Sequence, residues 1–172
     1  MEELKVLIDE KTLQERISEL AEEIMKDYKG KDITFICILK GSALFTVDLA
    51  KKIKNNVRLE FIRVSSYGNS TVSSGTVTMK LDLQDSIEGR DVIVIEDIID
   101  TGRTLSYLRD YLKDKKPGSL KICTLLDKKE RRQFDIEPDY TAFQIPDKFV
   151  VGYGLDDKED YRNLPYVGYF DV

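Results

Sequence analysis

Residues 92–104, which read VIVIEDIIDTGRT, constrain the fold of this chain more than any other segment. They begin with four consecutive β-branched residues, a pattern typical of a strand buried on both faces of a parallel sheet. Two adjacent carboxylates, Glu96 and Asp97, follow this apolar run. Open α/β sheets bind their ligands outside the carboxyl ends of the strands. The segment therefore predicts an α/β fold with a polar binding site at the end of this strand.

The loop after the acid pair has the composition of an anion-binding turn. It consists of Asp100, Thr101, Gly102, Arg103 and Thr104, and it leads into a stretch of helical character, LSYLRDYLK. Free N–H groups in such a loop and at a helix N-terminus favour a bound phosphate. Together with the carboxylates, the loop suits a ligand with sugar hydroxyls at one end and a phosphate at the other. The simpler alternative is a buried strand followed by solvated acids and an ordinary threonine N-cap.

Composition narrows the chemistry that the chain can perform. Its 172 residues are 41% hydrophobic and 34% charged, which fits one globular domain with a sizeable core. The formal net charge of −5 gives no electrostatic footprint for nucleic acid or for an anionic membrane. The chain has no histidine, so acid–base chemistry falls to Asp, Glu, Lys or Tyr. A catalytic metal would have oxygen ligands, which suit a hard cation such as Mg²⁺.

The remaining composition predicts a cytoplasmic protein. Cys37 and Cys123 each lie in an apolar run, which predicts buried core thiols and neither zinc binding nor a disulfide framework. The charged N-terminus lacks the apolar region of a signal peptide, and no apolar stretch approaches membrane-spanning length.

Strand and helix patterns alternate along the chain. Apolar spacing predicts a helix over 10–28 with Thr12 as its N-cap, and further helices from KGSALF to about Ile53 and over 104–113. Apolar runs predict strands at 33–39, 57–64, 92–96, 120–126, 140–145 and 149–153. This alternation predicts a central, mostly parallel sheet flanked by helices, with right-handed crossovers.

Residues 65–78 interrupt this alternation, because ten of the fourteen are Ser, Thr or Gly. A surface loop or a linker is the simpler interpretation, although the chain is too short to divide comfortably there. We expect instead a mobile lid that carries Ser66 and Tyr67, with room for a pair of short strands.

Residues 92–104 resemble the phosphoribosyl-pyrophosphate (PRPP) signature of the type I phosphoribosyltransferases. The resemblance implies that Glu96 and Asp97 meet the ribose hydroxyls and a Mg²⁺ ion, and that the loop after them holds the 5′-phosphate. It also implies that Asp100 is the base that takes or shares the N7 proton of a purine. Arg103 stands at a position that is variable in the signature, where it adds a phosphate contact or faces solvent.

LKGS at 39–42 extends the resemblance to the purine phosphoribosyltransferases. The resemblance implies that Lys40 and Gly41 bind pyrophosphate. In that family a non-proline cis peptide bond often precedes the lysine, and the sequence leaves open whether Leu39–Lys40 has one. As a pattern of four residues, the motif alone predicts only a helix-capping turn.

LLDKKERR at 125–132 places a basic cluster at the end of a predicted strand. An ammonium group only donates hydrogen bonds, so it suits the exocyclic oxygen of a 6-oxopurine and mismatches the amino group of adenine. The resemblance to the hypoxanthine-guanine branch assigns this role to Lys128, with Lys129 as the neighbouring alternative. A solvated loop or a small RNA-contacting patch would have the same composition.

The segment 146–166, PDKFVVGYGLDDKEDYRNLPY, contains close matches to the GYxLD and YRNLPY motifs of the same branch. The resemblance implies that the Phe149 ring stacks on the purine and that the backbone of Val150 reads the base edge. Asp156 would bind Mg²⁺ or lie beside it, and the forked guanidinium of Arg162 would bind pyrophosphate. By pattern alone, FVVGY is a core strand and Asp156 is a turn residue.

The full resemblance implies one domain over 1–172, with a core at about 30–145 and a hood from the N-terminal segment and about 146–172. Its activity would transfer the 5-phosphoribosyl group of PRPP to N9 of hypoxanthine or guanine, giving IMP or GMP and pyrophosphate, with Mg²⁺ as cofactor. No nucleic-acid or membrane partner is expected. Members of this family are typically dimers or tetramers, so the resemblance implies a homodimer or homotetramer. The alternatives are an RNA-binding regulator on this fold and a transferase for another base such as xanthine. A PRPP synthetase would need two such domains, for which the chain is too short.

Overall fold

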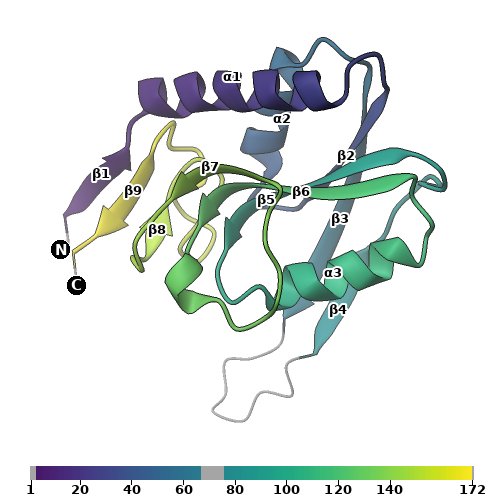
Figure 1. Cartoon of the computed structure of the whole chain (residues 1–172). Helices are drawn as coiled ribbons and strands as arrows, with labels where there is room; N and C mark the ends of the chain where they lie inside the picture. The colour runs from purple at the N-terminus through teal and green to yellow at the C-terminus, as the bar shows by residue number, and fades with distance from the viewer. Residues whose placement is uncertain (1–2, 67–75, 172) are drawn as a thin grey trace.

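The computed structural model describes residues 3–66 and 76–171 (Figure 1). In chain order its elements are β1 (Leu4–Ile8), α1 (Glu10–Asp27), β2 (Ile33–Ile38), α2 (Ala43–Lys52), β3 (Val57–Ser66), β4 (Val77–Leu81), β5 (Asp91–Ile99), α3 (Arg103–Lys113), β6 (Ser119–Asp127), the 3-10 helix η1 (Lys129–Arg131), β7 (Tyr140–Gln144), β8 (Val150–Val151) and β9 (Val167–Phe170).

The central sheet has the strand order β4-β3-β2-β5-β6-β7. Its neighbours are parallel from β3 to β7, and β3 and β4 form an antiparallel pair at one edge. Every side chain of β2 is buried, as expected for a central strand of a parallel sheet that is covered on both faces. The predicted α/β fold with a mostly parallel sheet is therefore confirmed.

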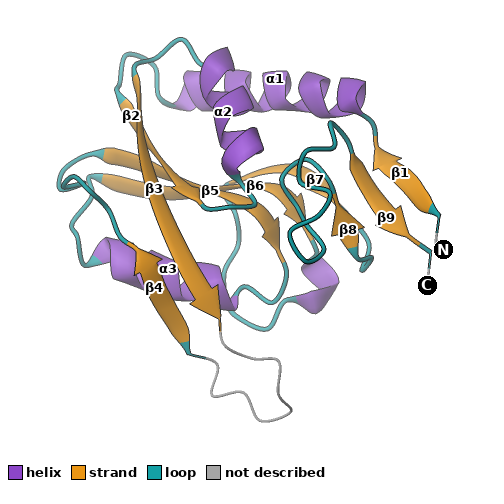
Figure 2. Ribbon diagram, turned by 180° about the vertical axis from the view of Figure 1, so that it is seen from behind, coloured by secondary structure: helices purple, strands orange, loops and turns teal. Residues whose placement is uncertain are grey.

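Helices cover both faces of this sheet (Figures 1 and 2). On one face, α1 and α2 pack on a core that includes Phe35 and Ile93, and on the other α3 packs through Leu108 against Val94. Both cysteines are free and buried, as predicted. None of the helices in residues 3–66 and 76–171 is long and apolar enough to cross a membrane.

The strands β1, β9 and β8 form a second, antiparallel sheet, which lies where the two ends of the described chain meet (Figure 1). The prediction that residues 149–153 complete the central sheet is wrong, because Val150 and Val151 pair with β9 instead. A short apolar run has the same pattern in either sheet, so its partner is decided by tertiary pairing.

Two local boundaries also differ from the sequence prediction. The N-cap of α1 is Asp9 and not Thr12, because the Asp9 carboxylate accepts a hydrogen bond from the Thr12 N–H at 2.7 Å. The strand β5 continues past the predicted end at residue 96, because its ladder with β6 extends to the pair Ile99 and Asp127. The acid pair therefore lies within the last residues of the strand.

Candidate active site

Four neighbouring parallel strands deliver the predicted site residues to the same edge of the central sheet. The strand β2 leads to Lys40, β5 carries the acid pair, β6 leads to Lys128, and β7 leads to Phe149. Parallel strands point their carboxyl ends the same way, so these segments converge although they are far apart in the sequence.

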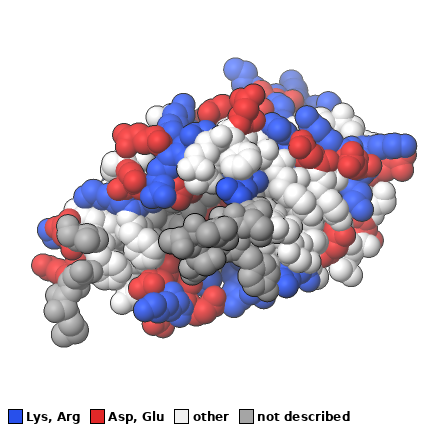
Figure 3. All heavy atoms as spheres, turned by 90° about the horizontal axis from the view of Figure 1, so that it is seen from below, with Lys and Arg blue, Asp and Glu red and all other residues white. Residues whose placement is uncertain are grey.

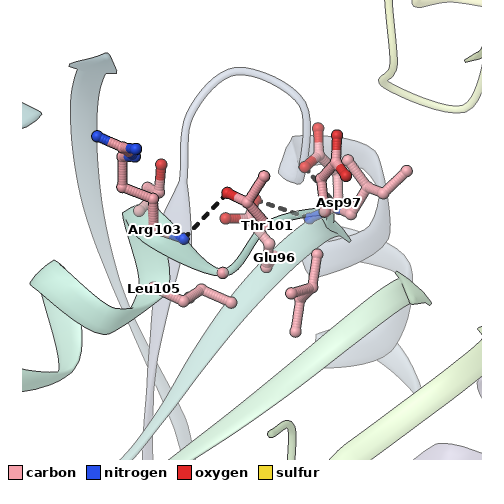
Figure 4. Close-up of a pocket in the computed structure, with 10 residues that line it drawn as sticks. Glu96, Asp97, Thr101, Arg103 and Leu105 are labelled. Carbon is pink, nitrogen blue, oxygen red and sulfur yellow. Dashed lines mark hydrogen bonds between the residues drawn. The ribbon is translucent and has the colours of Figure 1, made fainter. Parts of the chain in front are cut away.

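The acid pair lies near the end of β5 (Figure 4). Glu96 is 7% exposed and accepts a hydrogen bond from the Asp97 N–H at 3.0 Å, and Asp97 accepts one from the Ile98 N–H at 2.6 Å. Burial raises the pKa of Glu96 well above its ordinary value, and the neighbouring Asp97 charge raises it further. Burial also raises the pKa of Asp97. A bound cation or a set of hydroxyl donors would stabilise the ionised pair.

The predicted phosphate loop lines a cavity of about 220 Å³ together with the acid pair; its lining residues run from Glu96 to Leu105 and so include Thr101 and Thr104. Gly102 has a left-handed φ of 86° and forms the N-cap of α3, and the Arg103 N–H donates to Thr101 Oγ1 at 3.3 Å (Figure 4). The first turn of α3 contains no acidic residue. The positive end of the helix therefore remains available to an anion.

The segment 132–136 packs against this loop and forms hydrogen bonds with it. The N–H groups of Gln133 and Phe134 both donate to the carbonyl of Thr101, at 2.9 and 3.1 Å. A β-carbon at Gly102 would lie 2.4 Å from Ile136 Cγ2, so glycine is required by space as well as by φ. The Arg103 guanidinium lies 5.3 Å from the centre of the Phe134 ring, and Arg103 also lines the cavity.

A buried ion pair anchors this support to the sheet. Asp127 is fully buried at the end of β6, and its Oδ1 lies 2.5 Å from Arg132 Nη2. Arg132 Nε also donates to the carbonyl of Ile136 at 3.2 Å. This pair was not predicted, because the sequence KKERR gives no sign of which basic residue points inward.

The turn after β2 touches the acid pair directly. The Leu39–Lys40 peptide bond is cis, which settles the point that the sequence left open. A β-carbon at Gly41 would lie 1.7 Å from Asp97 Oδ2, and one at Gly154 would lie 2.1 Å from the Gly41 carbonyl oxygen. Gly154 has a φ of 100°, which only glycine adopts readily. Three segments that are distant in the sequence therefore meet here, with the Gly41 backbone against both the Asp97 side chain and the Gly154 backbone.

The two predicted pyrophosphate-binding cations share a carboxylate. Glu159 lies 2.8 Å from Lys40 Nζ through Oε2 and 3.0 Å from Arg162 Nη2 through Oε1. Arg162 Nη2 also lies 3.0 Å from Asp156 Oδ1, and its Nη1 donates to the Gly154 carbonyl at 2.7 Å. The structure brings Lys40 and Arg162 together, and their shared contact with Glu159 was not predicted from the sequence.

The predicted base and the predicted purine-reading lysine are linked through charged neighbours. Lys128 is 7% exposed whereas Lys129 is exposed, so burial favours Lys128 of the two candidates. Lys128 Nζ lies 3.5 Å from Asp147 Oδ1, and Arg131 Nη1 lies 3.4 Å from the same oxygen. Arg131 Nε lies 2.9 Å from Asp100 Oδ1. The chain of charges therefore runs from the predicted phosphate loop to the predicted purine-reading lysine.

The remaining predicted residues differ in their exposure to solvent. Phe149, the first residue of the apolar run FVVGY, is 52% exposed, whereas Val150 is buried. Ser66 is exposed at the end of β3, where it pairs with Val77 of β4. Tyr67, the other predicted lid residue, lies outside the described residues.

In the described part of the chain, no three Asp, Glu, Cys or His side chains gather into a metal-binding cluster. Glu96 is buried and the adjacent Asp97 is half-buried, and Asp156 is already paired with Arg162. Mg²⁺ usually takes one or two carboxylates and fills its other positions with water and substrate phosphates. A carboxylate pair beside an anion loop fits that mode of binding.

The model of the phosphoribosyl transferase domain family matches residues 7–158. The chain belongs to the phosphoribosyltransferase family. Among its relatives is the hypoxanthine-guanine phosphoribosyltransferase of Bacillus subtilis (strain 168), which is 51% identical over 95% of this chain and 91% of that protein. The bifunctional protein TilS/HprT of Listeria monocytogenes serotype 4b is 54% identical over 95% of this chain, which spans 25% of that longer relative.

Solved structures agree with this assignment. A crystal structure of a hypoxanthine-guanine phosphoribosyltransferase from Bacillus anthracis has a TM-score of 0.93 and 50% identity, covering 97% of this chain and 99% of that one. A hypoxanthine phosphoribosyltransferase from Staphylococcus aureus has a TM-score of 0.93 and 48% identity, covering 97% and 91%. The type I fold of this phosphoribosyltransferase is therefore as the resemblance implied.

Proposed function

We propose that this phosphoribosyltransferase transfers the 5-phosphoribosyl group of PRPP to N9 of hypoxanthine or guanine, forming IMP or GMP and releasing pyrophosphate. The observation that carries the proposal is the convergence of four strand ends on one edge of the sheet. That edge presents an anion loop, an acid pair of which Glu96 is buried, two cations and a buried lysine within one family fold.

The acid pair and the loop suit the ribose 5-phosphate part of PRPP. The N-terminus of α3 offers N–H donors to the 5′-phosphate, and Glu96 and Asp97 accept hydrogen bonds from the ribose hydroxyls. Their negative charge also favours the cationic sugar that forms as the bond to pyrophosphate breaks. This last attraction strengthens in the transition state, because the sugar becomes cationic only there.

The same pair, with Asp156 nearby, is our proposed contact for Mg²⁺, which when bound would neutralise charge on the departing pyrophosphate. Lys40 and Arg162 perform the same neutralisation with side chains of this chain. Each of these two side chains directs several N–H donors at the proposed pyrophosphate site, so the two cations orient the leaving group as well as bind it.

Asp100 is the proposed base for the purine N7 proton. It precedes the phosphate loop and faces the purine side through its ion pair with Arg131, at 2.9 Å. A carboxylate is the natural group for this task in a chain without histidine. The lid that begins at Ser66 is proposed to exclude water during transfer.

Lys128 and Phe149 are the proposed selectors of the base. A buried ammonium group left facing the amino group of adenine would lose its hydrogen bond, which penalises that base strongly. The exposed ring of Phe149 offers a surface for stacking, and the backbone of Val150 is proposed to read the base edge.

A homo-oligomer is also proposed. Leu44 and Val47 of α2 are 41% and 48% exposed, and Leu59 and Phe61 of β3 are 43% and 39% exposed. Leu59 pairs in register with Phe35, whose side chain faces the α1–α2 layer, so these apolar side chains lie on the same face of the sheet as α2. An apolar patch of this kind favours contact with another copy of the chain.

The RNA-binding alternative receives less support. On the face shown in Figure 3, basic and acidic side chains are interspersed, without a continuous basic area. Binding to a nucleic-acid backbone depends on such an area. The net charge of −5 points the same way.

The deciding experiment incubates the protein with PRPP, Mg²⁺ and one free base at a time, and separates the nucleotides by chromatography. We expect IMP from hypoxanthine, GMP from guanine and no AMP from adenine. The rate with xanthine, compared with the rates for hypoxanthine and guanine, measures how strongly backbone contacts at position 2 of the purine ring select the base. Nucleotide from adenine at a comparable rate, or none from either 6-oxopurine, would count against the proposal.

A further inference from the structure

We infer that the Glu159 side chain competes with pyrophosphate for its binding site. Without substrate, the Glu159 carboxylate forms ion pairs with Lys40 and Arg162, and it must leave both cations when PRPP or pyrophosphate binds. The inference rests on the proposed function, because it assigns to Glu159 the place of the leaving group. It concerns the affinity of this site and not the chemistry of transfer.

The geometry is that of a bridging anion. The two oxygens of one carboxylate divide between two cations, at 2.8 Å from Lys40 Nζ and 3.0 Å from Arg162 Nη2. Lys40 comes from the turn after β2 and Arg162 from the segment before β9, so only the folded chain brings them to a common anion. An anionic ligand that bound both cations would have to take the place of this carboxylate.

The turn that carries Glu159 holds this side chain over the site. Asp157 and Asp160 exchange backbone hydrogen bonds of 3.2 and 2.9 Å, and the Glu159 N–H donates to Asp156 Oδ2 at 2.8 Å. Glu159 has a φ of 74°, an uncommon conformation for a residue with a side chain. The carboxylate is nevertheless exposed, with 60% of its side-chain surface accessible, so it is free to swing into solvent.

The two ion pairs favour the charged form of the Glu159 carboxylate. Hydrogen bonds from Lys40 and Arg162 lower the pKa of Glu159 to about 2. Arg162 keeps other partners when Glu159 leaves, namely Asp156 Oδ1 and the Gly154 carbonyl. Its buried Nε has no hydrogen-bond partner within residues 3–66 and 76–171, so one donor is unused. Arg162 is therefore held in place for a ligand when Glu159 is displaced.

The test is the affinity of the Glu159→Gln variant for pyrophosphate in the presence of Mg²⁺, measured by calorimetry. Glutamine keeps the size of the side chain and removes the charge that both cations hold. Two exposed ion pairs are each worth a small amount, so we expect the dissociation constant to fall about three- to tenfold. The KM for PRPP should fall in parallel, and the KM for hypoxanthine should not change.

Asp160→Asn is the matched control, because it removes the same charge one residue away without touching either cation contact. Weaker or unchanged pyrophosphate binding by Glu159→Gln would overturn the inference, since it would make Glu159 a support for the cations. An equal gain in Asp160→Asn would also overturn it, because the effect would then be general electrostatics. Direct binding is measured without turnover, so these outcomes are distinct from failure of the wild-type protein to form nucleotide.

Discussion

The backbone of Gly41 lies against the carboxylate of Asp97, so closely that a β-carbon at position 41 would stand 1.7 Å from Asp97 Oδ2. The contact joins the turn after β2 to the end of β5, its neighbour in the sheet. Gly41 does not have a left-handed φ, so the need for glycine is one of space alone. The predicted pyrophosphate and ribose sites are therefore one continuous surface.

Gly41→Ala is expected to displace the Asp97 carboxylate and to lower kcat/KM for PRPP about a hundredfold, because small misplacements in an active site have effects of that size. Steady-state kinetics with varied PRPP would measure the effect. Gly30→Ala is the control: its left-handed φ of 75° makes alanine cost about 1–2 kcal/mol of stability, but nothing lies within 4 Å of the new carbon. Unchanged kinetics in Gly41→Ala would show that the turn after β2 can shift to make room for the β-carbon without affecting PRPP use.

Asp100→Asn is expected to lower kcat about 10²- to 10⁴-fold and to change the KM for PRPP only a few-fold. Asparagine keeps the shape of the side chain but cannot accept the N7 proton, and loss of a general base has effects of this size. Pre-steady-state nucleotide formation would isolate the chemical step. Asp110→Asn, on the exposed side of α3, controls for the charge change. Equal losses in kcat and in PRPP affinity would argue for a binding role instead.

Glu96→Gln is expected to stabilise the free protein at neutral pH. The pKa of Glu96 is raised in the folded state above its ordinary value of 4.5, so above pH 4.5 the unfolded state loses this proton first and stability falls as pH rises. The glutamine variant lacks this loss of stability. A gain of about 1 kcal/mol in the free energy of unfolding would raise its Tm at pH 7.5 by about 2–4 °C. The advantage should shrink toward pH 4.5, and PRPP affinity should fall. A pH-independent difference in Tm would contradict the assignment.

Phe149→Ala is expected to raise the KM for hypoxanthine about tenfold and to leave the KM for PRPP and the Tm nearly unchanged. The ring is 52% exposed, so its removal opens no cavity, whereas base stacking on an aromatic ring is worth about 1–3 kcal/mol. Tyr107→Ala, which removes a partly exposed ring from α3, is the control. A large drop in Tm would place Phe149 among the residues that stabilise the fold.

Arg132→Met is expected to destabilise the protein by about 3–5 kcal/mol, because it leaves the fully buried Asp127 carboxylate without its partner. Urea denaturation would measure the change. The double variant Arg132→Met, Asp127→Leu should regain most of the stability, since it removes both charges. Arg109→Met, which breaks exposed contacts to the Asp110 side chain and the Asp135 carbonyl, should cost less than about 1 kcal/mol. Equal effects of the two single variants would argue against a buried anchor.

Sequence patterns predicted the three α-helices and most strands of the central sheet, and the motifs supplied the candidate site residues. The apolar runs of β2 and β5 identify central strands, because burial on both faces favours a nearly continuous series of apolar residues. Ordered motifs such as VIVIEDIIDTGRT carry their chemistry within a few consecutive residues, so they are legible without coordinates. The burial of both cysteines followed from their apolar surroundings in the same way.

Tertiary structure alone decided which residues meet. Local periodicity depends on neighbours a few positions away, whereas contacts depend on pairing between strands distant in sequence. For that reason FVVGY could not reveal that β8 joins β9, nor could KKERR show that Arg132 faces Asp127 while Arg131 faces Asp100. The place of Glu159 between Lys40 and Arg162 exists only because the turn after β2 and the segment before β9 fold onto the same edge of the sheet.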